Sequence, residues 1–277
     1  MGLKQLFTSV ESMDSEAAKS FIEKHEEGTF TLLDVRQPAE YEEAHIPGAK
    51  LVPLPELHHS IEELEREKPV IVHCAVGGRS RVAAQLLSGL GFKEVYNLKG
   101  GIKGWQGFKA EGPRELNLDL VRGDEPPVEI AALAYGMEEC VQTFYKEMHN
   151  RAEDDELKGL FSKLASIEEK HKQTILELSA KIGAVGKGTE ISKTDTGGLV
   201  MEGGFDMVEF MAQNEPMLKK IPHVIELAMM LETQALDLYL RFADKSTNAE
   251  TKTILFKIAG EEKAHLAALG RLLEAKI

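Results

Sequence analysis

Two kinds of metal-binding side chain recur at one fixed spacing in the second half of this 277-residue sequence. The side chains form two sets of three, namely Glu138, Glu168 and His171, then Glu232, Glu262 and His265. The second set lies 94 residues after the first, since 232 − 138, 262 − 168 and 265 − 171 all equal 94. Tyr145 and Tyr239 keep the same separation, so the sequence indicates a duplicated helical unit.

The glutamate and histidine of each Glu-x-x-His pair lie three residues apart, so they share one face of a helix. Apolar residues mark the same face, among them Leu164 and Ile175 in the first unit and Ile258 and Leu269 in the second. An unpaired buried carboxylate is costly, and these faces carry no lysine or arginine to pair with it. Four glutamates and two histidines that converge from four helices imply a bound cation, with the ligand set of di-iron and di-manganese carboxylate bundles.

The elements that carry these residues are predicted from apolar periodicity. A helical hairpin is expected over residues 128–182, ending at Gly183, and a second over residues 221–275. A long glycine-rich crossover, residues 184–220, joins them and is expected to include a short covering helix within residues 205–214. Cys140 follows Glu138 by two positions, so we expect its thiol to point away from the metals and to pack in the core.

A cysteine-containing loop in the first half also has the features of a reactive site. The loop reads Cys74-Ala75-Val76-Gly77-Gly78-Arg79-Ser80 and follows the apolar run Val70-Ile71-Val72-His73. Its two glycines let successive N–H groups point inward, and a helix that begins near Arg79 adds its positive end. A thiol in that position is expected to have a lowered pKa and to act as a nucleophile. The alternative is a buried structural cysteine.

Strands and helices alternate around this loop. Apolar runs predict strands at residues 29–35, 70–73 and 95–98, and an amphipathic stretch predicts a helix over 81–90 that stops at Gly91. The alternation predicts an α/β domain with a parallel sheet over residues 1–112, whose ligands bind at the carboxyl ends of the strands. Repeated glycine and proline residues predict a linker over 113–127, and an all-α four-helix bundle follows over 128–277.

The composition narrows the choice of partner and compartment. The formal net charge of −13 argues against nucleic acid and anionic membranes as partners. No apolar run reaches the length of a membrane span, and the first residues lack the apolar core of a signal peptide. The two cysteines, Cys74 and Cys140, exclude a disulfide framework and a four-cysteine rubredoxin-type site. We therefore expect a cytoplasmic protein.

Several short motifs surround the cysteine loop in a characteristic order. They are Asp34-Val35-Arg36, then His45-Ile46-Pro47-Gly48-Ala49, the loop itself, and Gly100-Gly101-Ile102 with Trp105. Together they resemble the rhodanese domain over about residues 5–106. The resemblance implies a sulfurtransferase in which Cys74 carries a persulfide and Arg79 helps to hold an anionic sulfur donor. The rest of the loop would cradle the sulfur, namely Ala75, Val76, Gly77, Gly78 and Ser80.

The repeated residues of the helical half resemble a second family. Glu138 with Tyr145, Glu168 with His171 and their counterparts 94 residues later are similar to the ferritin-like superfamily and, within it, to the rubrerythrin-like branch. The resemblance implies two bound iron ions, with manganese as the other possible metal. Glu168 and Glu262 would bridge the metals, Glu138 and Glu232 would be terminal ligands, and each metal would take one histidine. Tyr145 and Tyr239 would hydrogen-bond to ligand carboxylates.

Two features depart from the rubrerythrin pattern. The chain lacks the cysteines of the rubredoxin-type iron site, and Ala235 stands where rubrerythrins have an additional glutamate, one turn after the third-helix ligand. Metal binding therefore follows from the resemblance more directly than peroxidase activity does.

These features together predict a sulfurtransferase that acts between a small-molecule sulfur donor and acceptor. It is fused to a di-iron domain that reduces peroxide or dioxygen with electrons from an unidentified donor, and we expect a homodimer. Two alternatives stay open. One is a ferroxidase or iron-handling protein with an accessory rhodanese domain, and the other is a non-enzymatic docking module with a structural metal site.

Overall fold

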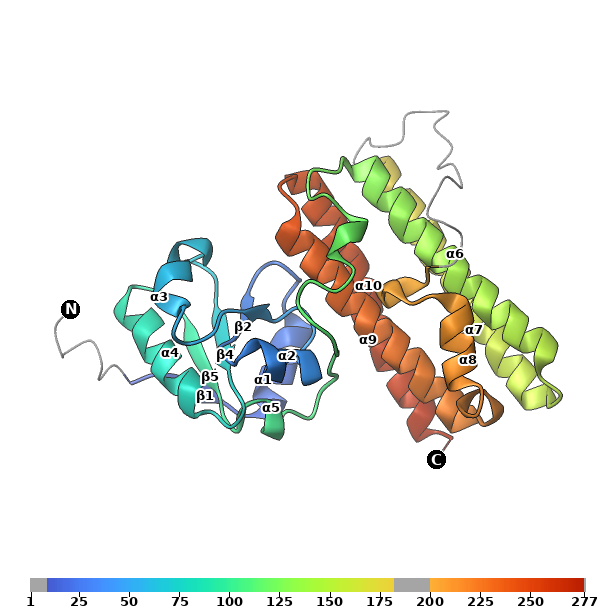
Figure 1. The fold of residues 1–277 in the computed structure, drawn as a ribbon, viewed down its shortest axis with the longest axis horizontal. Helices are drawn as coiled ribbons and strands as arrows, with labels where there is room; N and C mark the ends of the chain where they lie inside the picture. Colours follow the sequence, from blue (N-terminus) through green and yellow to red (C-terminus); the bar gives the residue numbers. More distant parts are fainter. Residues whose placement is uncertain (1–8, 182–199, 277) are drawn as a thin grey trace. The chain divides into compact units, whose positions relative to one another are not determined.

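The computed structural model describes residues 9–181 and 200–276, and the chain divides into two compact units, residues 1–116 and 117–277 (Figure 1). The division falls inside the segment predicted as a linker. Residues 117–126 belong to the second unit, where the Lys245 ammonium donates to the backbone carbonyl of Leu118 at 2.7 Å. Of the predicted crossover, residues 184–199 lie outside the described residues.

The first unit is built on a parallel sheet of short strands. In spatial order these are β1 (Glu11–Met13), β5 (Val95–Leu98), β4 (Val70–His73), β2 (Thr31–Asp34) and β3 (Lys50–Leu51). All neighbouring strands pair in parallel, as the alternation of strands and helices predicts. Strand β4 lies at the centre, so the loop that follows it opens at the carboxyl edge of the sheet.

Helices cover both faces of this sheet. They are α1 (Ser15–Lys24), α2 (Pro38–Glu43), α3 (Leu57–Ser60) followed by η2 (Ile61–Glu63), α4 (Gly78–Gly89) and α5 (Gly101–Gly104). Successive strand residues alternate between the two faces. Leu33 packs with the α3 and α4 side chains, whereas Leu32 packs with α1, α2 and α5. Helix α4 begins at Gly78 and not at residue 81, because its first turn starts inside the cysteine loop.

The second unit contains the two predicted helical hairpins. Helices α6 (Pro127–Arg151) and α7 (Asp155–Lys181) form the first, and α9 (Ile221–Lys245) and α10 (Ala249–Glu274) form the second. Pro127 begins α6 at a position where its missing N–H costs no helical hydrogen bond. Asn248 caps α10 by accepting from the N–H groups of Glu250 and Thr251.

Short elements complete the second unit. They are η3 (Leu118–Leu120), η4 (Glu202–Gly204), α8 (Met207–Asn214) and η5 (Met217–Lys219). Helix α8 confirms the covering helix predicted within residues 205–214. The η4 turn packs against α9 and α6. It precedes α8 in the orange segment of Figure 1.

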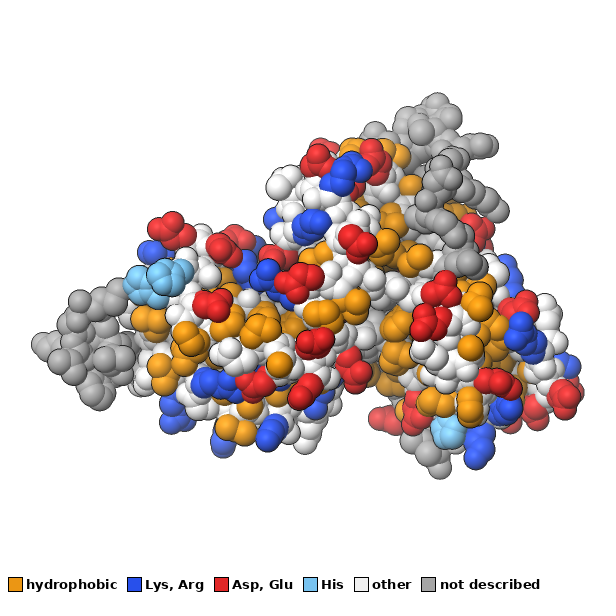
Figure 2. Space-filling model, in the orientation of Figure 1, with side chains coloured by type: hydrophobic (Ala, Val, Ile, Leu, Met, Phe, Trp, Pro, Cys, Tyr) orange, Lys and Arg blue, Asp and Glu red, His pale blue; other side chains and the backbone are white. Residues whose placement is uncertain are grey.

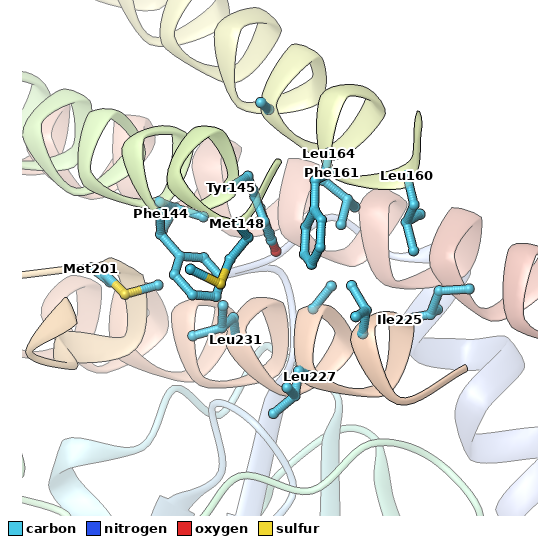
Figure 3. Close-up of a cluster of buried hydrophobic side chains, with 14 of the residues drawn as sticks. Phe144, Tyr145, Met148, Leu160, Phe161, Leu164, Met201, Ile225, Leu227 and Leu231 are labelled. Carbon is cyan, nitrogen blue, oxygen red and sulfur yellow. The ribbon is translucent and has the colours of Figure 1, made fainter. Parts of the chain in front are cut away.

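The bundle core consists of two apolar clusters. Val141 and Phe144 of α6 belong to one cluster, and Ala134 and Met137 of the same helix belong to the other. Figure 3 shows part of the first cluster, in which Phe144 and Leu231 converge from α6 and α9. Glu138 lies on α6 between the two groups of apolar residues, so the buried acidic side chains occupy the zone between the two clusters.

Two further features of the described residues are the distribution of charged side chains on the surface and the length and hydropathy of the helices. Acidic and basic side chains are interspersed over the visible face of each unit (Figure 2). None of the helices within residues 9–181 and 200–276 is both long enough and apolar enough to cross a membrane.

Candidate functional site

Cys74 lies at the end of β4, where the backbone turns into α4. Its side chain is buried. The N–H group of Gly77 donates to the sulfur at 3.1 Å, and the hydroxyl oxygen of Ser80 lies 3.4 Å from it. The same hydroxyl lies 2.7 Å from Asn97 Oδ1, and its single proton can serve only one of these acceptors at a time.

The surroundings of Cys74 favour the thiolate. Burial alone would raise the pKa of the thiol, but hydrogen bonds outweigh it and hold this pKa below its ordinary value. The donors are the Ser80 hydroxyl and the backbone N–H groups of Ser80, Gly77 and Val76. Cys140, by contrast, has no such set of donors among the described residues, and burial raises the pKa of its thiol to about 11. Only Cys74 therefore has the character of a nucleophile.

Helix α5 holds the backbone of the cysteine loop through hydrogen bonds. The N–H groups of Ile102 and Lys103 donate to the carbonyls of Cys74 and Ala75, at 2.8 and 3.1 Å. Gly101 has a φ of 57°, and a Cβ at this position would lie 2.2 Å from the Cys74 carbonyl oxygen. Only glycine permits this close approach, so the predicted Gly100-Gly101 motif serves to hold the loop.

Arg79 is engaged by a residue from another element. Both of its terminal nitrogens donate to Glu40 of α2, each at 2.6 Å, so the pair is bidentate. Donation from Arg79 lowers the pKa of the Glu40 carboxyl to about 2. The positive charge predicted to hold an anionic donor is thus paired with a carboxylate beside the loop.

The predicted metal ligands meet in the middle of the bundle. Three groups of candidate donor atoms each lie within 4.8 Å of one another, namely Glu138 with Glu168 and His171, then His171 with Glu262 and His265, then Glu138 with Glu202 and Glu262. His171 Nδ1 lies 3.2 Å from Glu138 and 3.1 Å from Glu168. Glu232 falls outside these groups, although its carboxyl is hydrogen-bonded to that of Glu262. The helices thus assemble donors from both hairpins.

Burial governs the electrostatics of this cluster. It raises the pKa of Glu138 and Glu262 well above the ordinary value, and neighbouring carboxylates add to the effect. It also raises the pKa of Glu232 to about 8. Burial opposes protonation of His171, but the adjacent Glu138 and Glu168 outweigh it and raise its pKa to about 11. The pKa of His265 is lowered to about 3 by burial and by His171.

The donor set fits a metal ion of the iron or manganese type. Four of the six predicted ligands have a buried atom without a hydrogen-bond partner in the described part of the chain, namely Glu138 Oε1, Glu232 Oε2, Glu262 Oε2 and His265 Nδ1. Lys172, the buried cation nearest to them in sequence, bonds to Gln142 at 3.1 Å and to Glu169 at 3.0 Å instead. A cation among these carboxylates would satisfy the unpartnered oxygens and offset their mutual repulsion.

The two predicted tyrosines differ in their surroundings. Tyr239 is buried and donates its hydroxyl to Glu202 Oε1 at 2.6 Å, so its partner is not one of the predicted ligands. Tyr145 is also buried, and after burial the carboxylates of Glu168 and Glu232 contribute most to its raised pKa. Figure 3 shows the Tyr145 hydroxyl pointing in among the helices.

Glu202 is a buried member of this cluster that the sequence did not reveal. It lies in η4, outside both hairpins, and has no counterpart in the 94-residue repeat. The only sequence feature that could have drawn attention to Glu202 is its local segment, Met201-Glu202-Gly203-Gly204, in which one acidic residue stands between a methionine and two glycines.

Comparison with known proteins identifies both halves of the chain. Residues 17–108 match the family model of the rhodanese-like domain, and residues 129–273 match that of rubrerythrin. The two matches occur in the predicted order, and the parallel sheet followed by a helical bundle confirms the predicted fold class. The rubrerythrin family implies iron binding.

Individual relatives match the first half. An uncharacterized protein of Bacillus subtilis, YqhL, is 47% identical over 76 residues, which are 27% of this chain and 60% of that protein. The thiosulfate sulfurtransferase GlpE of Coxiella burnetii is 43% identical over 75 residues, 27% of this chain and 70% of that protein. The crystal structure of the Alr3790 protein from Anabaena sp. covers 36% of this chain and 92% of its own, with 33% identity and a TM-score of 0.34. The chain thus spans less than two thirds of YqhL.

Proposed function

This chain belongs to the rubrerythrin family and carries a rhodanese-like domain ahead of the rubrerythrin domain, and we propose that it combines two activities. The first is sulfur transfer through a persulfide on Cys74. The second is reduction of peroxide or dioxygen at a two-iron centre in the helical bundle. The hydrogen bonds to the Cys74 sulfur support the first proposal, and the convergence of unpartnered carboxylates and imidazoles supports the second.

Sulfur transfer uses the residues of the loop in two steps. The Cys74 thiolate attacks the outer sulfur of a thiosulfate-type donor, the sulfur–sulfur bond of the donor breaks, and sulfite leaves with the bonding electron pair. The N–H groups of Gly77 and its neighbours hold the negative charge of the persulfide. A nucleophilic acceptor then takes the terminal sulfur and returns Cys74 as the thiolate, so the cycle needs no external reductant.

This proposal is tested on the full chain by mass spectrometry. Incubation with thiosulfate is expected to add the mass of one sulfur atom, and cyanide is expected to remove it as thiocyanate. Cys74→Ser should abolish both changes, whereas Cys140→Ser, the matched control at the other cysteine, should retain them. Sulfur loading in the Cys74→Ser variant would assign the chemistry to another residue.

In the bundle, the six repeated residues would hold two iron ions, which supply one electron each for a two-electron reduction. The ligands are Glu138, Glu168, His171, Glu232, Glu262 and His265. Four carboxylates balance the four positive charges of two ferrous ions, so the centre can be buried in an apolar bundle. Six side chains also leave coordination positions for an oxidant.

An anaerobic titration with Fe(II) tests the metal proposal. Binding should saturate near two ions per chain, and the reduced protein should consume peroxide again after each re-reduction. Continued uptake of many ions with a mineral-like absorbance would instead show iron storage. Tight binding of zinc alone, without a redox change, would show a structural site.

A further inference from the structure

We propose that Glu202, on the crossover between the two hairpins, is a further ligand of the metal centre and that Tyr239 holds it in position. This inference rests on the proposed metal centre and adds to it a residue that lies outside the duplicated hairpins. The ligand it would help to bind is a divalent first-row cation of the iron type, for which carboxylate oxygen is a suitable donor.

The position of Glu202 is the first observation. The residue is 2% exposed, and one of its carboxylate oxygens lies within 4.8 Å of candidate donor atoms of Glu138 and Glu262. Glu138 comes from the first hairpin and Glu262 from the second. Each of these two also has an oxygen atom that is buried and without a hydrogen-bond partner among the described residues. Glu202 thus lies where carboxylates of both hairpins meet, beside oxygens that are available to a cation.

The turn that carries Glu202 is held firmly. Met201 has no exposed surface, and Figure 3 shows it in the same apolar cluster as Phe144. The N–H of Met201 donates to the Phe205 carbonyl at 2.8 Å, and the Asn117 side chain donates to the Gly203 carbonyl at 3.1 Å. These contacts fix the backbone of the turn, and they therefore fix the position from which the Glu202 side chain extends.

Glycine lets this turn approach helix α9 closely. Gly203 has a φ of 74°, in the left-handed region, and a Cβ there would lie 2.8 Å from the Cβ of Gln234 on α9. Any other residue would push the turn away from the helix. Since Tyr239 is also on α9, the close approach keeps Glu202 within reach of the tyrosine hydroxyl.

The bond from Tyr239 orients the carboxylate. The hydroxyl donates to Glu202 Oε1 at 2.6 Å, and an oxygen of this carboxylate lies within 4.8 Å of donor atoms of Glu138 and Glu262. Glutamine at position 202 could accept the same hydrogen bond from Tyr239 without adding a buried charge. A fifth carboxylate buried among four others adds repulsion, and a bound cation offsets that repulsion. The choice of glutamate at this position therefore points to metal binding.

A cobalt titration of the full chain tests this inference apart from activity. Anaerobic Co(II) is added to the metal-free protein, and its visible absorbance and the bound metal per chain are measured. The wild-type chain should bind two ions. Glu202→Gln should weaken one of the two binding constants by about 10- to 100-fold and change the cobalt spectrum. Glu209→Gln, the matched control at an exposed glutamate of α8, should change neither.

Two further variants keep the test decisive. Glu202→Asp retains the charge but shortens the side chain, so it should also weaken one binding constant, and Tyr239→Phe should do so to a smaller extent. Unchanged constants and spectrum in Glu202→Gln and Glu202→Asp would overturn the role of Glu202. A loss of metal that only parallels a loss of helical circular dichroism would also overturn it. Fewer than two ions in the wild-type chain would instead contradict the two-metal centre itself.

Discussion

The Nε2 atoms of His171 and His265 lie 2.7 Å apart, on rings that stack with 3.6 Å between their centroids. One imidazole comes from each hairpin, so the contact joins the two halves of the bundle at the centre of the ligand set. The pKa of His171 is raised and that of His265 is lowered, so the two rings do not both carry a positive charge near neutral pH. The predicted ligands of the two hairpins are therefore in direct contact.

Metal binding is expected to stabilise the second unit through both hairpins. At a metal concentration about 1,000 times Kd, the free energy of unfolding should rise by about 4 kcal/mol for each site. His265→Asn should remove much of this gain, because one donor is lost. The measurement is thermal unfolding by circular dichroism with and without added Mn(II), as a redox-inert probe. The control His223→Asn, on α9 outside the ligand set, should keep the full gain. An equal metal-induced gain in both variants would contradict the role of His265.

Loss of the Ser80 hydroxyl is expected to make Cys74 less reactive near neutral pH. The hydroxyl helps to lower the pKa of the thiol, so Ser80→Ala should move the midpoint of the alkylation rate against pH upward. The rate with iodoacetamide is followed by mass spectrometry. Cys140 stays largely unmodified in this range because its pKa is about 11. Ser88→Ala, on the same helix, serves as the control, and an unchanged midpoint in Ser80→Ala would show that the backbone donors suffice.

Removal of the Glu40 carboxylate is expected to strengthen binding of an anionic sulfur donor. Glu40 neutralises Arg79 beside the loop, so Glu40→Gln leaves the guanidinium free to attract the anion. For a partly exposed charge pair, an effect of about 1 kcal/mol corresponds to a roughly fivefold lower KM for thiosulfate, with kcat little changed. Glu43→Gln, also on α2 and exposed, is the control. A higher KM in Glu40→Gln would mean that the pair holds Arg79 in its productive position.

His73 is expected to make the first unit sensitive to acid. Burial lowers its pKa in the folded state to about 4, from 6.5 when unfolded. Between these values the unfolded chain binds a proton that the folded chain does not, so stability falls as the pH falls, by up to about 3 kcal/mol. His73→Gln should show a smaller fall. Urea unfolding at pH 7.5, 6 and 5 is followed by the fluorescence of Trp105, the single tryptophan, which reports on the first unit alone. Equal falls in both proteins would rule out this contribution of His73.

The sequence predicted the candidate sites best where their geometry depends on residues that are close together in the chain. Glu168 and His171 are three residues apart on one helix, and Cys74 directly follows a strand, so their geometry is contained in a few residues. The 94-residue repeat then indicated the remaining predicted ligands, because the second hairpin repeats the pattern of the first. The helices and strands that were predicted from apolar periodicity lie within a few residues of their expected ends, whereas β1, β3 and helices α1, α2, α3 and α5 were not predicted.

Contacts between distant segments were not predictable in this way. Glu40 and Arg79 are 39 residues apart, and nothing in the spacing of either residue indicates their bidentate pairing. Glu202 follows no periodic pattern, and only the tertiary packing of its turn against α9 brings it to the predicted metal ligands. In both cases a side chain meets its partner through the path of the backbone and not through a local motif.

The internal repeat bears on how such a centre can originate. A single ancestral hairpin, paired with a copy of itself about a twofold axis, would already supply two sets of one glutamate and one Glu-x-x-His pair. Glu202 has no such ancestor, since the position 94 residues earlier (202 − 94 = 108) is Phe108 in the other compact unit. A carboxylate on the connection between hairpins can be added only after the two copies share one chain. As a ligand without a counterpart, Glu202 would make the two proposed metal positions chemically different, although the two hairpins supply the same residue types.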